Sequence, residues 1–196
     1  MENFLALVVF AFTMAFTPGP NNVISTASGV NYGYIRTLPF ILGVAIGFPV
    51  MIATVGLGLG FVFEALPWLH DVMKYLSIAY LLWLAIKIAT ASSVGSSSDS
   101  KPLTFWQGAG FQWINPKSWA AGTSTLGTFT SSDAGNFYWQ VALIAGVYVV
   151  AGIGSTSAWT LFGAGIARFL DNPKFLKAFN LSMAALLVGS LIVMFV

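Results

Sequence analysis

The sequence contains no cysteine, a single histidine and very little charge. Without cysteine, the chain has no disulfide, no thiol nucleophile and no cysteine-ligated metal site. Only 7% of its residues are charged, whereas soluble domains carry about 25%. Such a chain has too few charges to cover a water-facing surface, so lipid must be its solvent. The net charge of +2, without a clustered basic tract, also argues against a nucleic-acid partner.

Hydrophobic residues, by contrast, make up 57% of the 196 residues. A bilayer core of about 30 Å is crossed by about 20 apolar residues in a helix. The sequence therefore predicts an all-α integral membrane protein that forms a single transporter-sized domain over residues 1–196. Its six expected transmembrane helices cover residues 3–30, 39–63, 71–91, 104–130, 137–165 and 174–196.

Lysine and arginine are unevenly divided between the expected loops. The residues that follow the first, third and fifth helices are Arg36, Lys87, Lys101, Arg168, Lys174 and Lys177. Only Lys74 falls in a loop on the other side, and Lys117 lies inside the fourth helix. Loops rich in lysine and arginine face the cytoplasm. The pattern therefore predicts a multi-pass membrane protein with both termini outside the cytoplasm.

The two halves of the chain share a pattern. The stretches "LSIAYLLWLAIKI" from Leu76 and "LSMAALLVGSLIV" from Leu181 match at several positions without gaps. The first and fourth helices are each broken, by "TPGPNN" at 17–22 and by "NPKS" at 115–118. Three helices per half is an odd number, so the second half enters from the opposite side. The sequence predicts two inverted three-helix repeats, about 1–91 and 104–196, with a linker at about 92–103 and helices 1 and 4 broken near the midplane.

Each break has a chemical meaning as well as a structural one. Proline removes an N–H donor and suits the first turn of a helix, so Pro20 and Pro116 are each expected to begin a second half-helix. Asn115 is a good N-cap because its side-chain oxygen can accept an unpaired backbone N–H. Helix N-termini attract anions. Because the halves enter from opposite faces, the two breaks are expected to approach each other.

These breaks hold the candidate binding site. Lys117 adds a positive charge at membrane depth, where an ionisable side chain indicates function. The alternative is that proline and glycine only kink the helices for packing, and that Lys117 snorkels to a surface. Two matched breaks, each with asparagine, favour a carboxylate-binding site. Its candidate substrate-binding residues are Pro18, Gly19, Pro20, Asn21, Asn22, Asn115, Pro116 and Lys117.

At these residues the chain resembles a known family. The stretch "FTPGPNNVISTASGVNYGYIRTLPFILGVAIGF" at 16–48 looks like the signature of the LysE/RhtB family of bacterial amino-acid exporters, and "FWQGAGFQWINPKSW" at 105–119 looks like its second motif. The stretches "KIATASS" and "KPLTFW" look most like the cysteine/O-acetylserine exporter subgroup. The resemblance implies an inner-membrane exporter driven by the proton motive force, with roles for the residues of both breaks. It leaves the oligomeric state open, a homodimer included.

The acidic residues bear on the substrate. All of them lie at helix ends or in loops, namely Glu2, Glu64, Asp71, Asp99, Asp133 and Asp171. No carboxylate is therefore available to pair with a cationic substrate, and an unpaired buried charge is costly. The sequence predicts a small, neutral, polar substrate of the cysteine, O-acetylserine, homoserine or threonine kind. Lys117 is also the candidate for the residue that couples transport to protons.

Other classes of function fit less well. A membrane-embedded enzyme or redox carrier needs a nucleophile with a base, a metal cluster or a thiol pair, and the expected helices contain neither cysteine nor histidine. We therefore expect no catalytic residue, no metal and no cofactor. A passive amino-acid channel stays an alternative, because only accumulation against a gradient distinguishes it from an exporter.

Two stretches of small residues raise a question of packing. Gly43 and Gly47 have the G-x-x-x-G spacing of closely packed helices. The stretch "GIGSTS" at 152–157 is either a second packing seam or a polar lining of the transport pathway, and the sequence does not decide between the two.

Overall fold

A computed structural model describes residues 4–59, 65–66, 68–91, 101–131, 134–170 and 172–195, and these ranges contain helices but no strand. The elements are α1 (Phe4–Phe16), α2 (Pro20–Thr54), the π-helical η1 (Val55–Leu59), α4 (Trp68–Ala89), α5 (Phe105–Ile114), α6 (Pro116–Phe129), α7 (Ala134–Ala167) and α8 (Pro173–Phe195). The all-α prediction is confirmed. Most of the predicted linker, residues 92–100, lies outside the described residues.

Four helical segments are long and apolar enough to cross a membrane. They are Pro20–Gly58, Asp71–Ala89, Asn136–Ala167 and Pro173–Ile192. The last three correspond to the third, fifth and sixth predicted helices. The first and fourth predicted helices are interrupted where the sequence indicated, because α1 gives way to α2 at Pro20 and α5 gives way to α6 at Pro116.

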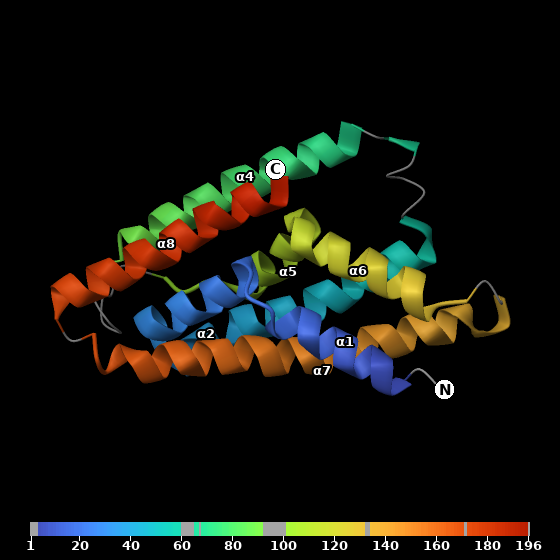
Figure 1. Cartoon of the computed structure of the whole chain (residues 1–196), viewed down its shortest axis with the longest axis horizontal. Coiled ribbons are helices and arrows are strands. Elements are labelled where there is room, and N and C mark those ends of the chain that lie inside the picture. Colours follow the sequence, from blue (N-terminus) through green and yellow to red (C-terminus); the bar gives the residue numbers. More distant parts are fainter. Residues whose placement is uncertain are drawn as a thin grey trace.

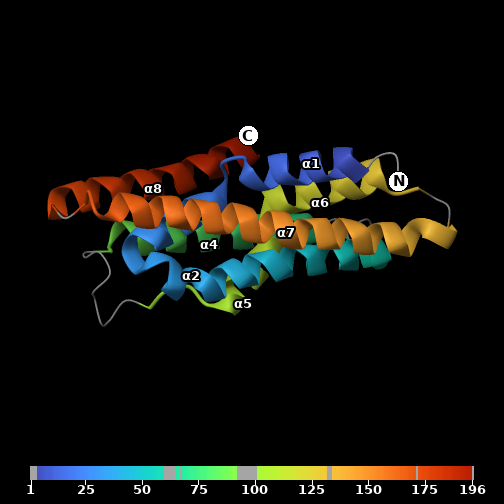
Figure 2. The same cartoon turned by 90° about the horizontal axis from the view of Figure 1, so that it is seen from below.

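The long α2 is two helices joined by a single residue. Gly33 has φ 74° and ψ 174°, outside the helical region, whereas its neighbours stay helical. A positive φ of this kind is open to glycine at little cost. The chain reverses direction at this residue, as both views show (Figures 1 and 2). The sequence predicted a loop between residues 30 and 39, and the structure replaces that loop with one glycine.

Contacts with α7 confirm the reversal. Before Gly33, residue numbers on α2 and α7 rise together, and after Gly33 they run in opposite directions. The contacts that fix these directions are Asn22 with Ser155 and Thr26 with Gly163 before the turn, and Ala45 with Gly152 and Phe48 with Tyr148 after it. Residues 20–32 therefore lie parallel to α7, and residues 34–59 lie antiparallel to it.

The remaining helices pack around this hairpin. In both views α7 extends along nearly the whole molecule, and α1 leads into the first half of α2 beside it (Figures 1 and 2). α5 and α6 form a second broken pair that runs the opposite way, since Phe129 packs on Phe10 while Lys117 reaches Thr17. α4 and α8 pack against each other along one side (Figure 1).

Glycines allow several helix backbones to touch. A Cβ atom at Gly43 would overlap the main-chain carbonyl of Phe105, and one at Gly47 would overlap Ala109. The G-x-x-x-G pair therefore packs against α5, as predicted. On the other side of the hairpin, Gly163 of α7 sits in the same way on the carbonyl of Thr26. Small residues at these crossings let helices approach closely in lipid.

One end of the molecule carries most of the basic residues. The reversal of α2, the end of α4 and the connection between α7 and α8 all lie there (Figure 1). Those segments contain Arg36, Lys87, Arg168, Lys174 and Lys177, and the main chain of Lys101 is hydrogen-bonded to Lys87. Lys74 and Asp71 lie at the start of α4, at the other end. The uneven division of charge read from the sequence is therefore a division in space.

The hydrophobic core consists of two separate clusters. One gathers Ile24, Phe40 and Phe111 with residues of α4 and α8. The other gathers Leu7, Ile52 and Tyr148 with residues of α6 and α7. Residues beside the breaks pack against both clusters, Val23 and Ile114 against the first and Ala15 against the second.

Candidate functional site

The two breaks lie against each other, as the sequence predicted. The side-chain amides of Asn21 and Gln112 bond reciprocally, with Asn21 Nδ2 donating to Gln112 Oε1 at 2.9 Å and Gln112 Nε2 donating to Asn21 Oδ1 at 3.2 Å. Lys117 Nζ donates to the main-chain carbonyl of Thr17 at 2.5 Å. Residues about ninety positions apart in the chain therefore form one polar centre.

The second break has the predicted local geometry. Asn115 is extended, and its Oδ1 accepts a hydrogen bond from the backbone N–H of Lys117 at 3.1 Å. Pro116 occupies the first position of α6, where its missing N–H does no harm. The prediction of Asn115 as the N-cap is confirmed.

The first break is held open differently. Gly19 precedes α2 without a side-chain cap. Asn22 instead reaches backwards, and its Nδ2 donates to the carbonyls of Ala15 at 3.0 Å and Thr17 at 2.9 Å. These carbonyls belong to the end of α1, which has no further turn to satisfy them. Asn22 therefore links the two half-helices across the interruption.

Each break also frees one main-chain carbonyl. Pro18 and Pro116 have no N–H to offer the carbonyl four residues earlier, which belongs to Met14 in one case and to Gln112 in the other. Met14 and Gln112 both line the cavity described below. The two prolines thus leave hydrogen-bond acceptors on residues of the cavity wall.

Lys117 points at the end of α1. Besides Thr17, its Nζ has the carbonyl of Pro18 at 3.4 Å. A cation at a helix C-terminus is favourable because the unpaired carbonyls carry partial negative charge. From the sequence, Lys117 was expected to add to the positive potential of the half-helix N-termini. The structure instead holds it on carbonyl oxygens, beside the N-cap Gly19.

Gly19 leaves room for this lysine. A Cβ atom there would lie 2.8 Å from Lys117 Cδ and 3.0 Å from Nζ, so the lysine would have to move. Gly19→Ala is therefore expected to lower transport on the order of tenfold with little change in melting temperature. The transport rate and the melting temperature are measured on the same purified protein. Gly127→Ala is the control, since nothing lies within 4 Å of that Cβ position, and equal transport by the two variants would contradict the prediction.

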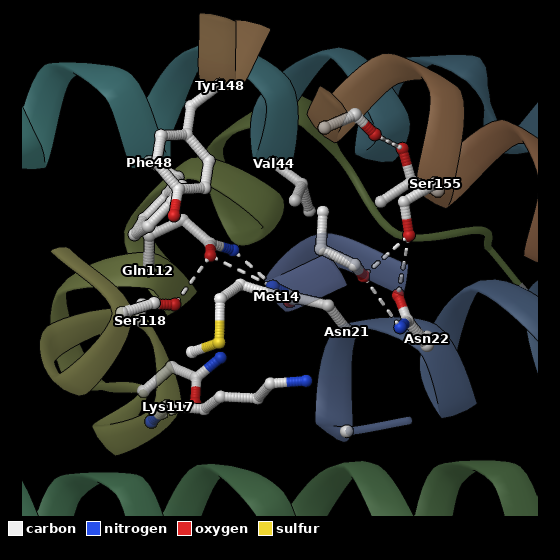
Figure 3. A pocket seen from close by; sticks show the side chains of 16 residues that line it. Met14, Asn21, Asn22, Val44, Phe48, Gln112, Lys117, Ser118, Tyr148 and Ser155 are labelled. Atoms are coloured by element: carbon white, nitrogen blue, oxygen red, sulfur yellow. Dashed lines mark hydrogen bonds between the residues drawn. The ribbon is translucent and has the colours of Figure 1, made fainter. Parts of the chain in front are cut away.

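A small cavity of about 70 Å³ opens at the crossing of the breaks (Figure 3). Its more polar lining residues are Gly19, Asn21, Asn22, Gln112, Asn115, Lys117, Ser118, Ser155 and Thr156. Its more apolar lining residues are Met14, Ala15, Val44, Phe48, Ala121, Tyr148 and Gly152. Of the eight predicted site residues, Gly19, Asn21, Asn22, Asn115 and Lys117 line it, while Pro18, Pro20 and Pro116 shape the backbone beside it.

Sequence reasoning missed Gln112. This side chain is buried, and it makes four hydrogen bonds, two with Asn21, one from Ser118 Oγ at 2.9 Å and one to the carbonyl of Gly108 at 2.9 Å. It fixes Asn21 in place and ties α5 to α2. An uncharged amide three residues before "NP" in an apolar helix was the available signal.

The stretch at 152–157 serves both as a polar lining of the cavity and as a packing seam, the two alternatives that the sequence left open. Ser155 lines the cavity and donates to the carbonyl of Ala15 at 2.7 Å, and Thr156 lines it beside Gly152. Ser157 lies 3.1 Å from the hydroxyl of Tyr34 and helps to pack α7 on α2. The site therefore takes its polar side chains from α2, from α5 and α6 on either side of the second break, and from α7.

Of the described residues that line the cavity, Lys117 alone is charged. Among the described residues, no group of three histidine, cysteine or acidic side chains could hold a metal ion. The cavity thus offers a cation, amides, hydroxyls and freed carbonyls, which suit the binding of a polar solute.

A family model for the LysE type translocator matches residues 12–194 of the chain. The chain belongs to this family. Membership makes it a translocator rather than an enzyme, and together with the apolar helices it makes the protein a multi-pass membrane protein. The resemblance noted at the two motifs therefore holds over nearly the whole chain.

Curated relatives of this translocator carry a common name. The cysteine/O-acetylserine efflux protein of Salmonella typhimurium is 27% identical over 184 residues, which are 93% of this chain and 92% of the relative. The protein of that name from Escherichia coli K12 is 26% identical over the same shares. No solved structure matches the chain.

Proposed function

We propose that the protein is a secondary active exporter of small neutral amino acids. The observation that carries this proposal is the cavity at the crossing of the two breaks, whose wall includes Lys117 and the two residues with freed carbonyls, Met14 and Gln112. Membership of a translocator family and the efflux function in the relatives' names support it.

The cavity has a suitable partner for each charged end of an amino acid. A carboxylate can accept hydrogen bonds from Lys117 and from the amide nitrogen of Asn115, close to the uncapped N-terminus of α2. The ammonium group can donate to the freed carbonyls of Met14 and Gln112. Both breaks thus bind the backbone part of the substrate, which all amino acids share.

The charge of the cavity limits the substrate to neutral side chains. A lysine or arginine substrate would place a second cation in a wall whose charged member is Lys117, and burying an unpaired charge is costly. Small polar side chains of the cysteine, O-acetylserine, homoserine or threonine kind fit the charge and the volume of the cavity. The names of the relatives are consistent with the first two.

The proposal includes a six-span topology with an inverted repeat. Two features support six spans: the reversal of α2 at Gly33, and the pairs of consecutive helices on either side of each break. Corresponding elements of the two halves run antiparallel, which an inverted repeat requires. The repeats are about 1–91 and 104–196, and residues 1–196 form a single domain in the inner membrane.

We expect both termini to face the periplasm, because basic loops stay in the cytoplasm and the described basic residues gather at the end of the molecule that contains the Gly33 turn. Fusions of alkaline phosphatase and of a fluorescent protein to the C-terminus measure this. The phosphatase fusion should be active and the other dark. Fluorescence without phosphatase activity would show that the C-terminus lies in the cytoplasm, which contradicts the prediction.

Protons are the proposed coupling ion, and Lys117 is the titratable residue placed to carry the coupling. The test is uptake of labelled cysteine, homoserine and threonine into proteoliposomes with an imposed pH gradient. Accumulation above the outside concentration, abolished by an uncoupler, is the expected result. Equilibration without accumulation would indicate a passive channel, and no uptake of any amino acid would overturn the proposed function.

A further inference from the structure

Tyr148 of α7 holds a special place in the cavity. It is one of the largest fully buried side chains, and its ring packs edge-on against Phe48 at 4.8 Å between centroids. Its hydroxyl lies 2.9 Å from Thr125 Oγ of α6. Figure 3 shows the ring pointing from α7 into the cavity, towards the side where Gln112 and Ser118 lie. Tyr148 therefore brings a hydroxyl group to the cavity wall beside Phe48.

The direction of the Tyr148–Thr125 hydrogen bond follows from a second bond. Thr125 Oγ lies 2.6 Å from the carbonyl of Ala121. A carbonyl oxygen only accepts, so the single hydroxyl proton of Thr125 must point at Ala121. Tyr148 is then the donor to Thr125. Its own oxygen is left with acceptor capacity, and no other hydrogen bond to it occurs among the described residues.

A ligand that reaches Tyr148 thus meets an acceptor. In this row of hydrogen bonds, Tyr148 donates to Thr125 and Thr125 donates to Ala121. A ligand that donates to Tyr148 would extend the row in the same direction. A ligand group with lone pairs alone would face another lone pair. To donate instead, Tyr148 would have to leave Thr125, and a lost hydrogen bond between buried groups is costly.

The part of the substrate that reaches Tyr148 is its side chain. The carboxylate and ammonium have partners at the breaks, namely Lys117, Asn115 and the freed carbonyls. Tyr148 packs on Phe48 and bonds to Thr125, neither of which belongs to a break, so its hydroxyl is assigned to the variable side chain rather than to the charged groups that all amino acids share.

We infer that Tyr148, oriented by Thr125, selects amino acids whose side chains end in a hydrogen-bond donor. Hydroxyl and thiol side chains, as in threonine, homoserine and cysteine, satisfy its free acceptor. Apolar isosteres such as valine leave that acceptor unpaired. O-acetylserine, whose acetyl ester offers acceptors alone, ranks below the donors within the proposed substrate class. The inference rests on the proposed function, since it concerns the substrate of the same cavity.

The experiment compares isosteric pairs as competitors of labelled homoserine uptake in proteoliposomes. Threonine and valine differ by a hydroxyl in place of a methyl group, and serine and alanine by one hydroxyl. In the wild type, threonine should compete at least about tenfold better than valine. Tyr148→Phe should reduce that ratio to within about twofold, because it removes the acceptor and little volume.

Thr125→Val should shift the preference towards ligands that accept a hydrogen bond, whereas Tyr148→Phe only removes the preference for donors. A purely structural role of Thr125 would not produce such a shift. Removing Oγ frees the Tyr148 proton to turn into the cavity, so O-acetylserine should gain on threonine about tenfold relative to the wild type. Thr123→Val and Tyr138→Phe are the matched controls on the same two helices. Thr123 makes the same kind of bond to its own helix, and Tyr138 is exposed.

The outcomes separate the two levels of the proposal. If the wild type transports no amino acid, the proposed function fails. If it transports but shows no threonine preference, or if the preference survives in Tyr148→Phe, the inference about Tyr148 is wrong while the exporter stands. A Thr125→Val protein that keeps the wild-type order of competitors would equally overturn the direction assigned to the hydrogen bond.

Discussion

Lys117→Ala should lower export at least about tenfold, which is the effect of losing one hydrogen bond to a charged group, and Lys117→Arg should restore only part of it. Alanine removes the one cation of the cavity wall. Arginine keeps the charge, but its planar, bulkier group cannot occupy the place beside Gly19 in the same way. Export is measured in cells that overproduce the substrate and in proteoliposomes, with the amount of protein determined in each.

The fold should survive the loss of Lys117. The carbonyl of Thr17 also accepts a hydrogen bond from Asn22, so the end of α1 keeps a partner. Lys87→Ala is the matched control, because Lys87 likewise donates to a main-chain carbonyl, that of Lys101, but outside the cavity. Normal export by the Lys117→Ala variant would show that this lysine only neutralises the helix end.

The second large effect concerns a glycine at which two backbones touch. Gly163→Ala should destabilise the protein by about 2 kcal/mol, as overpacking of a tight contact does, because its Cβ would overlap the carbonyl of Thr26. Neither atom belongs to a flexible side chain that could move aside. The first half of α2 and α7 would have to separate, which disturbs the wall of the cavity on both helices.

Gly165→Ala provides a sharp comparison on the same helix. Nothing lies within 4 Å of its Cβ position, so alanine there should raise stability by up to about 1 kcal/mol through helix propensity. Thermal unfolding of the two purified variants in one detergent measures the difference. Equal melting temperatures would mean that α2 and α7 are less closely packed than the structure has them.

Local features of the site followed from the sequence. Proline and asparagine act on their own backbone neighbours, so the interruptions at Pro20 and Pro116 and the cap by Asn115 could be read from residue types alone. The meeting of the two breaks also followed, since an odd number of helices per half forces opposite entry. Whether the predicted residues bind substrate stays a prediction until transport is measured.

Other features depend on partners that are distant in the sequence. Gln112 carries little signal of its own beyond being an amide in an apolar helix, because its importance comes from Asn21 on another helix. The role of Tyr148 depends on which way a proton points on Thr125, and that direction is set by a carbonyl one turn away. The turn at Gly33 was placed in a loop because flanking polar residues resemble a loop in composition, although one positive φ suffices for the reversal.

The one-residue turn at Gly33 has a consequence for biogenesis. On the six-span topology, the first span carries a break whose polar groups would each cost several kcal/mol if they faced lipid. The second span is attached to it by a single residue, so the two cannot leave the insertion machinery separately. They must enter the bilayer as one hairpin, and a nascent chain truncated at Gly33 should fail to retain its first span in the membrane.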